Sequence, residues 1–255
     1  PAPAGDDAVA IIGMAGRFPG AADPAALWRL LEAGGSALGP VPAERWPDGW
    51  FDPAGGGGRS YTRIGGFLPE IDCFDPLYFG ISPADAEALD PQERLFLETA
   101  WHALEDAGST PARLQARSGP VGVYVGVMNA GYQWLAAQQA AGGPAPATSS
   151  YWSIANRLSY VANLLGPSLA VDTACSSSLT ALHLAVEALR RGDCGAAVVG
   201  GVNLIVHPRQ LGNLSEARML SPSGDCRAFG ADADGFVDGE GVVALMLKPL
   251  AAALR

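Results

Sequence analysis

The chain has 255 residues, of which 49% are hydrophobic and 16% are charged, and its formal net charge is −10. This length and apolar content allow a substantial buried core and exclude an intrinsically disordered chain. The negative charge disfavours a nucleic-acid-binding protein, which needs a basic face for the phosphates.

The sequence also predicts where the protein is located. The opening stretch PAPAGDDAVAIIG has no basic segment before a long apolar core, so we expect no signal peptide. The longest apolar runs have the length of strands, so we expect no membrane contact. The four cysteines, Cys73, Cys175, Cys194 and Cys226, form no C-x-x-C pair. We therefore expect neither a metal site nor a disulfide scaffold, and a reducing cytoplasm as the location.

Five apolar runs are continuous rather than alternating, which is typical of strands that helices cover on both faces. In chain order they are 8–13, 121–127, 168–173, 196–204 and 241–247. An α/β fold with a largely buried sheet follows from this pattern.

Three helices are predicted between the strands. In DPAALWRLLEAG, Asp23 is the N-cap, Pro24 the first residue and Gly34 the stop. In DPQERLFLETAWHALEDAG, Asp90 caps, Glu93 completes a capping box, and Phe96, Ala100, Ala103, Leu104 and Ala107 form a buried stripe. The third helix, 176–191, would bury Leu179, Leu182, Val186 and Leu189.

Residues 47–66 and 140–150 are predicted to be surface loops. The glycine run 55–58 lacks the Lys-Ser/Thr of a phosphate-binding loop and is expected to be flexible. Gly13, Gly16 and Gly20 do not have the spacing of a dinucleotide-binding motif, so we expect a tight strand-to-helix turn there.

Cys175 stands between an apolar strand and a helix, in the stretch VDTACSSSL. The unpaired N–H groups and the dipole at a helix N-terminus favour a thiolate. A sharp turn would expose the sulfur, and Ser176–Ser178 would be small caps that leave space for a substrate. The sequence therefore predicts a nucleophile at Cys175; a buried, inert cysteine is the alternative.

None of the three histidines is an evident partner for this thiol. His183 lies eight residues further along the same helix, roughly 12 Å away. His102 falls inside a helix, and His207 precedes Pro208 in an expected loop. We expect all three to be structural.

The stretch VDTACSSSL resembles the active-site signature of the β-ketoacyl synthases, in particular the ketosynthase domains of modular polyketide synthases. The resemblance continues through FDPLYFGISPADAEALDPQERLFLETAWHALEDAG, GGVNLIVHP and ARMLSPSGDCRAFGADADGFVDGEG. The stretch VGVYVGVMNAGYQWL is similar to the ketosynthases of assembly lines served by a free-standing acyltransferase. Many of that subtype carry a bulkier residue than Ala174 before the cysteine, and Ala174 suggests a roomier approach to the thiol.

The resemblance implies a thiolase-like α/β fold. Residues 1–255 would be its N-terminal half, a five-stranded mixed sheet with helices on both faces, in which 174–191 is the buried central helix. Gly200 and Gly201 would let backbone run close to the cysteine.

The resemblance also implies a reaction. Cys175 would accept an acyl chain from the phosphopantetheine arm of an acyl carrier protein, and the domain would bind no cofactor of its own. A carrier-bound malonyl unit would then lose CO2 and attack the acyl thioester. The Cys175 N–H would supply an oxyanion donor, and Phe229 and Phe236, with Ala174, would line the substrate pocket.

The family's two further catalytic histidines lie in H-G-T-G-T and N-x-G-H motifs, and this sequence contains neither. The resemblance therefore implies that a C-terminal half of the ketosynthase is missing. It also implies a homodimer joined through the strand at 168–173. Two alternatives remain, a non-catalytic interaction fragment whose cysteine is never acylated, and a thiolase-type enzyme.

Overall fold

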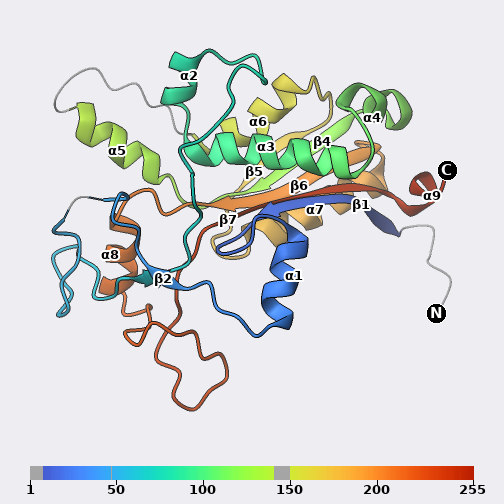
Figure 1. The fold of residues 1–255 in the computed structure, drawn as a ribbon. Helices are drawn as coiled ribbons and strands as arrows, with labels where there is room; N and C mark the ends of the chain where they lie inside the picture. Colours follow the sequence, from blue (N-terminus) through green and yellow to red (C-terminus); the bar gives the residue numbers. More distant parts are fainter. Residues whose placement is uncertain (1–7, 47, 141–149) are drawn as a thin grey trace.

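The computed structural model describes residues 8–46, 48–140 and 150–255. Its centre is a five-stranded sheet in the order β1-β7-β6-β4-β5 (Figure 1). The strands are β1 (Val9–Arg17), β4 (Val121–Gly126), β5 (Ser168–Val171), β6 (Ala196–Asn203) and β7 (Gly241–Pro249). All five predicted strands are present.

The sheet is mixed, as predicted. β4 pairs in parallel with both β5 and β6, whereas β7 runs antiparallel to β6 and β1. The carboxyl ends of the three parallel strands, β4, β5 and β6, therefore lie at the same end of the sheet. Strand β5 is one of the two outer strands of the sheet. Strand β1 is longer than the predicted 8–13 because it continues through Gly16 to Arg17 against β7.

Helices cover both faces of the sheet, which explains why the strands are continuous apolar runs. All six residues of β4 are buried. Helices α3 (Pro91–Asp106) and α6 (Tyr151–Val161) lie on one face, and α7 (Ser177–Arg191) lies on the other (Figure 1). The apolar side chains form a separate buried cluster on each face.

Helix α3 begins as predicted but is more deeply buried than one stripe. Asp90 caps it by accepting a hydrogen bond from the Gln92 N–H at 2.8 Å, and eleven of its residues are buried. The predicted capping box is wrong: the Glu93 carboxylate instead accepts hydrogen bonds from Ser153 and from Arg157 Nε, the latter at 2.7 Å. Because the Glu93 side chain is fully buried, it needs these partners from α6.

The face that α7 buries agrees with the prediction except at Leu179: Leu189 is buried, and Leu182 and Val186 are partly buried against the same cluster. Ala181, Ala185 and Ala188 face the sheet together with Leu189, whereas Leu179 is 70% exposed. Small side chains let the helix axis approach β4 and β6 closely, and larger residues would hold it away. The segment is thus covered on one face, and in the described part of the chain it is not the fully buried helix that the resemblance implies.

Most shorter elements carry weaker signals, and the sequence did not predict them. They are α2 (Pro83–Ala88), α4 (Pro111–Ser118), α5 (Gly131–Ala140), α6, α8 (Arg209–Glu216), α9 (Leu250–Ala253) and the two-residue strands β2 (Gly39–Pro40) and β3 (Ile64–Gly65). Helix α1 (Pro24–Glu32) was predicted, and its Asp23 cap accepts from the Ala26 N–H at 2.6 Å. No helix in the described ranges is long and apolar enough to cross a membrane.

The predicted loops and glycine turns need correction. The 47–66 segment ends in β3 and buries Ser60 and Thr62, so it is not simply a surface loop. The loop predicted at 140–150 lies almost entirely outside the described residues. Gly13 and Gly16 fall within β1, and only Gly20, with φ +68°, lies in the turn before α1. All four glycines of 55–58 have positive φ, as expected of a glycine-rich loop.

Gly13 is the point where β1 packs directly on the end of α3. A Cβ at this position would lie 2.4 Å from the Ala103 carbonyl oxygen and 2.7 Å from the Ala107 nitrogen. We therefore predict that Gly13→Ala destabilises the fold by about 1–3 kcal/mol, the usual range for overpacking. Urea unfolding followed by circular dichroism measures this.

The matched control for this prediction is Gly39→Ala, because no atom lies within 4 Å of the added Cβ there. It should change stability by less than about 0.5 kcal/mol. Equal effects of the two substitutions would contradict the packing argument.

Candidate active site

Cys175 lies in the turn that joins β5 to α7, as predicted. The strand ends at Val171 and the helix begins at Ser177. The Cys175 side chain is exposed and lines a cavity of about 320 Å³. The thiol is therefore accessible from solvent and not sealed in the core.

Hydrogen bonds from the neighbouring polar residues hold this turn. The Asp172 carboxylate accepts from the Ala174 N–H at 3.0 Å, and the Ser176 hydroxyl donates to the Thr173 carbonyl at 2.9 Å. The Ser177 hydroxyl accepts from the Thr173 N–H at 2.9 Å and donates to the Ala174 carbonyl. The N-cap Ser176 makes no side-chain cap to α7. Ser176 and Ser177 therefore fix the turn, which corrects their predicted role as caps.

Two glycines bring the start of α7 against the ends of the central strands. A Cβ on Gly126 would lie 2.4 Å from the Ser178 nitrogen, and one on Gly201 would lie 2.9 Å from the Ser178 Cβ. The prediction for Gly201 is therefore confirmed. Gly200 faces the opposite side, where a Cβ would meet the Val243 carbonyl oxygen at 2.1 Å. Its absent side chain serves the contact with β7 and not the cysteine.

Two polar residues of the cavity lining, Asn203 and Glu240, were not predicted from the sequence. Asn203, at the end of β6, accepts from Asn129 Nδ2 at 2.7 Å and donates to the Gly239 carbonyl at 2.8 Å. Glu240 also lines the cavity, and its side chain is fully buried. The available signal was a polar residue at the carboxyl end of an otherwise apolar strand, as Asn203 is.

Glu240 joins three separate segments of the chain. Its carboxylate forms an ion pair with Arg45 at 2.9 Å and accepts from the Leu68 N–H at 2.7 Å and the Ile205 N–H at 2.9 Å. Each bond compensates the cost of burying the charge. Glu240 is thereby fixed relative to the segment that follows β6.

The structure brings only some of the predicted pocket residues together. Ala174 lines the cavity beside Cys175. Phe236 instead packs in a separate cluster with Trp46, Ile205, Leu211 and Leu220, and Phe229 is fully exposed with φ +63°. Neither phenylalanine is among the residues that line this cavity in the described chain, and a role in substrate binding stays a prediction for both.

No histidine lines the cavity within the described ranges. His102 and His183 are exposed. His207 is half-buried, and its Nε2 lies 3.0 Å from Gln138 Nε2. Burial lowers the pKa of His207, and the nearby Arg209 lowers it further. Its surroundings therefore favour the neutral imidazole.

The described residues contain no group of three or more His, Cys, Asp or Glu side chains that could hold a metal ion. Among the residues that line the cavity, Cys175 contributes a thiol and Asn203 a polar side chain. This combination is suited to covalent catalysis at a carbonyl carbon.

The family of the chain follows from these features together with its sequence. Residues 6–253 match the model of the β-ketoacyl synthase N-terminal domain, and the chain belongs to this family. Its fold is the thiolase-like fold of polyketide synthase ketosynthases. The oxazolomycin ketosynthase domain OzmH KS7 of Streptomyces albus is 47% identical, superposes with a TM-score of 0.91, and is matched over 96% of this chain and 44% of its own.

Other relatives are much longer proteins. The chain is 51% identical to the polyketide synthase ThaG of Burkholderia thailandensis over 97% of its own length and 4% of the relative. It is 50% identical to the polyketide synthase PksM of Bacillus subtilis, covering 96% of this chain and 6% of the relative. The chain thus spans a small part of the curated relatives it matches.

Ala174 has φ +56°, a left-handed conformation that is strained for any residue with a Cβ. An L-residue in this region costs about 1–2 kcal/mol, and the extra freedom of glycine in the unfolded chain costs about 0.5–1 kcal/mol. We predict that Ala174→Gly stabilises the protein by about 0.5–1 kcal/mol in urea unfolding.

Ala174→Val should have the opposite effect, because a β-branched residue tolerates positive φ poorly. A glycine variant less stable than the wild type would contradict the assigned strain.

Proposed function

We propose that residues 1–255 are the N-terminal part of a ketosynthase domain of a modular polyketide synthase, and that Cys175 is its acyl acceptor. The observation that carries this proposal is the exposed thiol in the turn before α7, which lines a cavity. The parent domain would be an acyltransferase of the β-ketoacyl synthase type.

The first step of the proposed reaction is a thiol–thioester exchange. The Cys175 sulfur attacks the carbonyl carbon of an acyl thioester, and a new carbon–sulfur bond forms as the bond to the phosphopantetheine sulfur breaks. The proton that leaves the Cys175 thiol ends on the departing thiol, so no oxidant or cofactor is needed. The Cys175 N–H and the N-terminal dipole of α7 would stabilise the oxyanion.

The second step would be decarboxylative condensation with a malonyl-type extender. Charge develops on the malonyl carbonyl in this step, and the family stabilises it with two histidines. The present sequence has neither motif, and the three histidines it has do not line the Cys175 cavity. We therefore propose that this chain accepts an acyl group but requires further ketosynthase residues for condensation.

The substrates would arrive on the phosphopantetheine of an acyl carrier protein, the proposed partner. Ala174 would give a roomier approach to the thiol than a bulkier residue, which would allow substituted acyl chains. We also propose that the assembly line containing this domain is served by a free-standing acyltransferase.

A non-catalytic interaction fragment is the second candidate. The observations that favour it are the missing histidine motifs and the exposed outer face of α7 around Leu179. The two candidates differ in one measurable property, which is acylation of Cys175.

Incubation of the chain with an acyl-pantetheine thioester should add a single acyl group, measured by intact-mass spectrometry. Cys175→Ser should abolish the addition because the acceptor sulfur is lost. Cys73→Ser and Cys226→Ser are the matched controls, since both thiols are also exposed. Cys194 should stay unmodified because it is buried and burial raises its pKa.

An acyl adduct that persists in Cys175→Ser, or one that maps to Cys73 or Cys226, would contradict the proposed acceptor. No adduct on the folded wild-type chain would support the interaction fragment.

We also expect a homodimer joined through β5. This strand is at the edge of the sheet, and Leu169 on it is exposed together with Trp152 and Tyr160 of α6 and the nearby Leu165. An apolar edge of this kind pairs readily with another strand. Light scattering at micromolar concentration should give twice the monomer mass, and Leu169→Lys with Tyr160→Glu should shift it to the monomer.

Trp28→Ser is the control for the dimer, because Trp28 is equally exposed but lies on α1. It should leave the dimer intact. A monomeric wild-type chain would contradict the proposed interface.

A further inference from the structure

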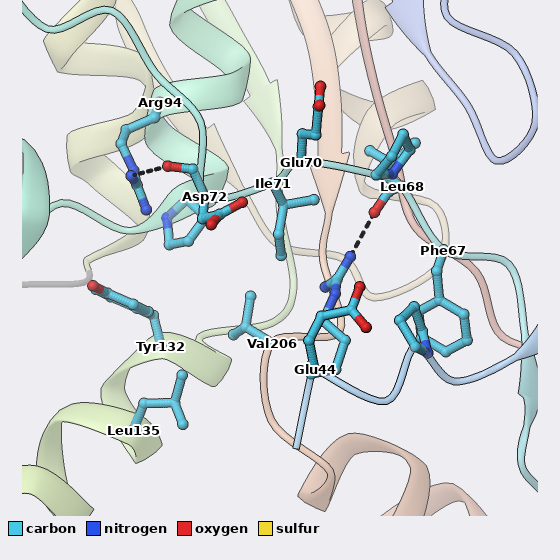
Figure 2. A pocket seen from close by; sticks show the side chains of 14 residues that line it. Glu44, Phe67, Leu68, Glu70, Ile71, Asp72, Arg94, Tyr132, Leu135 and Val206 are labelled. Atoms are coloured by element: carbon cyan, nitrogen blue, oxygen red, sulfur yellow. Dashed lines mark hydrogen bonds between the residues drawn. The ribbon is translucent and has the colours of Figure 1, made fainter. Parts of the chain in front are cut away.

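The described structure has a cavity larger than the one at Cys175. It has a volume of about 580 Å³ and shares no lining residue with the Cys175 cavity. Its walls come from the segments around Glu44 and 67–72, from the first turns of α3 and from α5 (Figure 2). A cavity of this size is within the range of small-molecule sites.

Arg94, in the second turn of α3, is a cation in the wall of this cavity. It is only 9% exposed, and none of the ion pairs formed by the described residues includes it. One guanidinium nitrogen donates to the Asp72 carbonyl at 3.2 Å, whereas Nε is buried without a hydrogen-bond partner. The Glu98 carboxylate on the same helix is close enough to interact electrostatically with Arg94, but it leaves the buried Nε without a hydrogen-bond acceptor. An anion in the cavity would supply that acceptor.

The other residues of the lining indicate which chemical group the ligand needs besides its negative charge. Ile71, Leu135 and Val206 are apolar, and Tyr132 presents its ring because its hydroxyl donates to the Glu87 carbonyl at 2.8 Å. In Figure 2 Tyr132 and Leu135, both on α5, lie below Arg94. A ligand therefore needs an apolar body beside its charged end.

The charge of the ligand is limited by three exposed carboxylates in the lining, those of Glu44, Glu70 and Asp72. They would repel a phosphate or another polyanion, whereas a single carboxylate can approach the guanidinium. Carboxylates also match the planar guanidinium, with which they form charge-assisted hydrogen bonds.

We propose that this cavity binds a monocarboxylic acid with an apolar body, with its carboxylate on Arg94 and its body against Ile71, Leu135 and Val206. The site is separate from the acyl acceptor and does not depend on the chemistry of Cys175.

Octanoate is the probe for this site, and isothermal titration calorimetry with the full chain is the measurement. Octanoate should bind more tightly than octan-1-ol, which has the same tail but no charge. Arg94→Gln should weaken octanoate binding on the order of tenfold or more, as expected for loss of a charge-assisted hydrogen bond. It should leave the weak binding of octan-1-ol nearly unchanged.

A second variant keeps the test valid if Arg94→Gln does not fold. Leu135→Trp fills the cavity from α5 and should abolish octanoate binding while circular dichroism stays that of the wild type. Cys175→Ser is the matched control and should bind octanoate as the wild type does. The proposal is overturned if octanol binds as tightly as octanoate, if folded Leu135→Trp binds normally, or if Cys175→Ser loses binding.

Discussion

The position of the candidate nucleophile depends on the close approach between the N-terminus of α7 and the ends of β4 and β6. This contact is possible only because Gly126 and Gly201 have no side chains, so that the strand backbone reaches Ser178 directly. Any Cβ at Gly126 would push the helix away from the sheet and would move the turn that carries Cys175. The exposed thiol is thus a consequence of backbone packing, and the local preference of the TACSSS stretch alone would not produce it.

The part of the cavity lining that Glu240 contributes is fixed by a different kind of interaction. Glu240 is a buried charge, and it is compensated by an arginine and two amides from distant parts of the sequence. Directional bonds of this kind define one arrangement of the surrounding loops, whereas apolar packing tolerates several. The cavity therefore has one wall positioned by steric contact and one positioned by hydrogen bonds.

The sequence alone predicted the five strands and three helices, because long apolar runs and Asp-Pro caps are strong local signals. It predicted that Leu182, Val186 and Leu189 of α7 pack on the core, but not that alanines make the closest contact with the sheet, since the spacing between helix and strand decides this. The partner of Glu93 was missed because Arg157 lies 64 residues away and the capping box is a local rule. The motif identified Cys175 and Ala174 in the cavity. The contributions of Asn203 and Glu240 depend on tertiary contacts that have no sequence period.

The outer strand β5 is short, with only four residues from Ser168 to Val171. A strand that added to it would gain very few backbone hydrogen bonds, and these bonds are the same for every sequence. Discrimination between a correct and an incorrect partner would then rest on the side chains beside the strand, above all Tyr160, Leu165 and Leu169. A shift of one residue would turn every side chain of the added strand to the other face. Because β5 is short, the choice of partner would depend on how well the side chains fit together, and much less on the backbone hydrogen bonds between the strands.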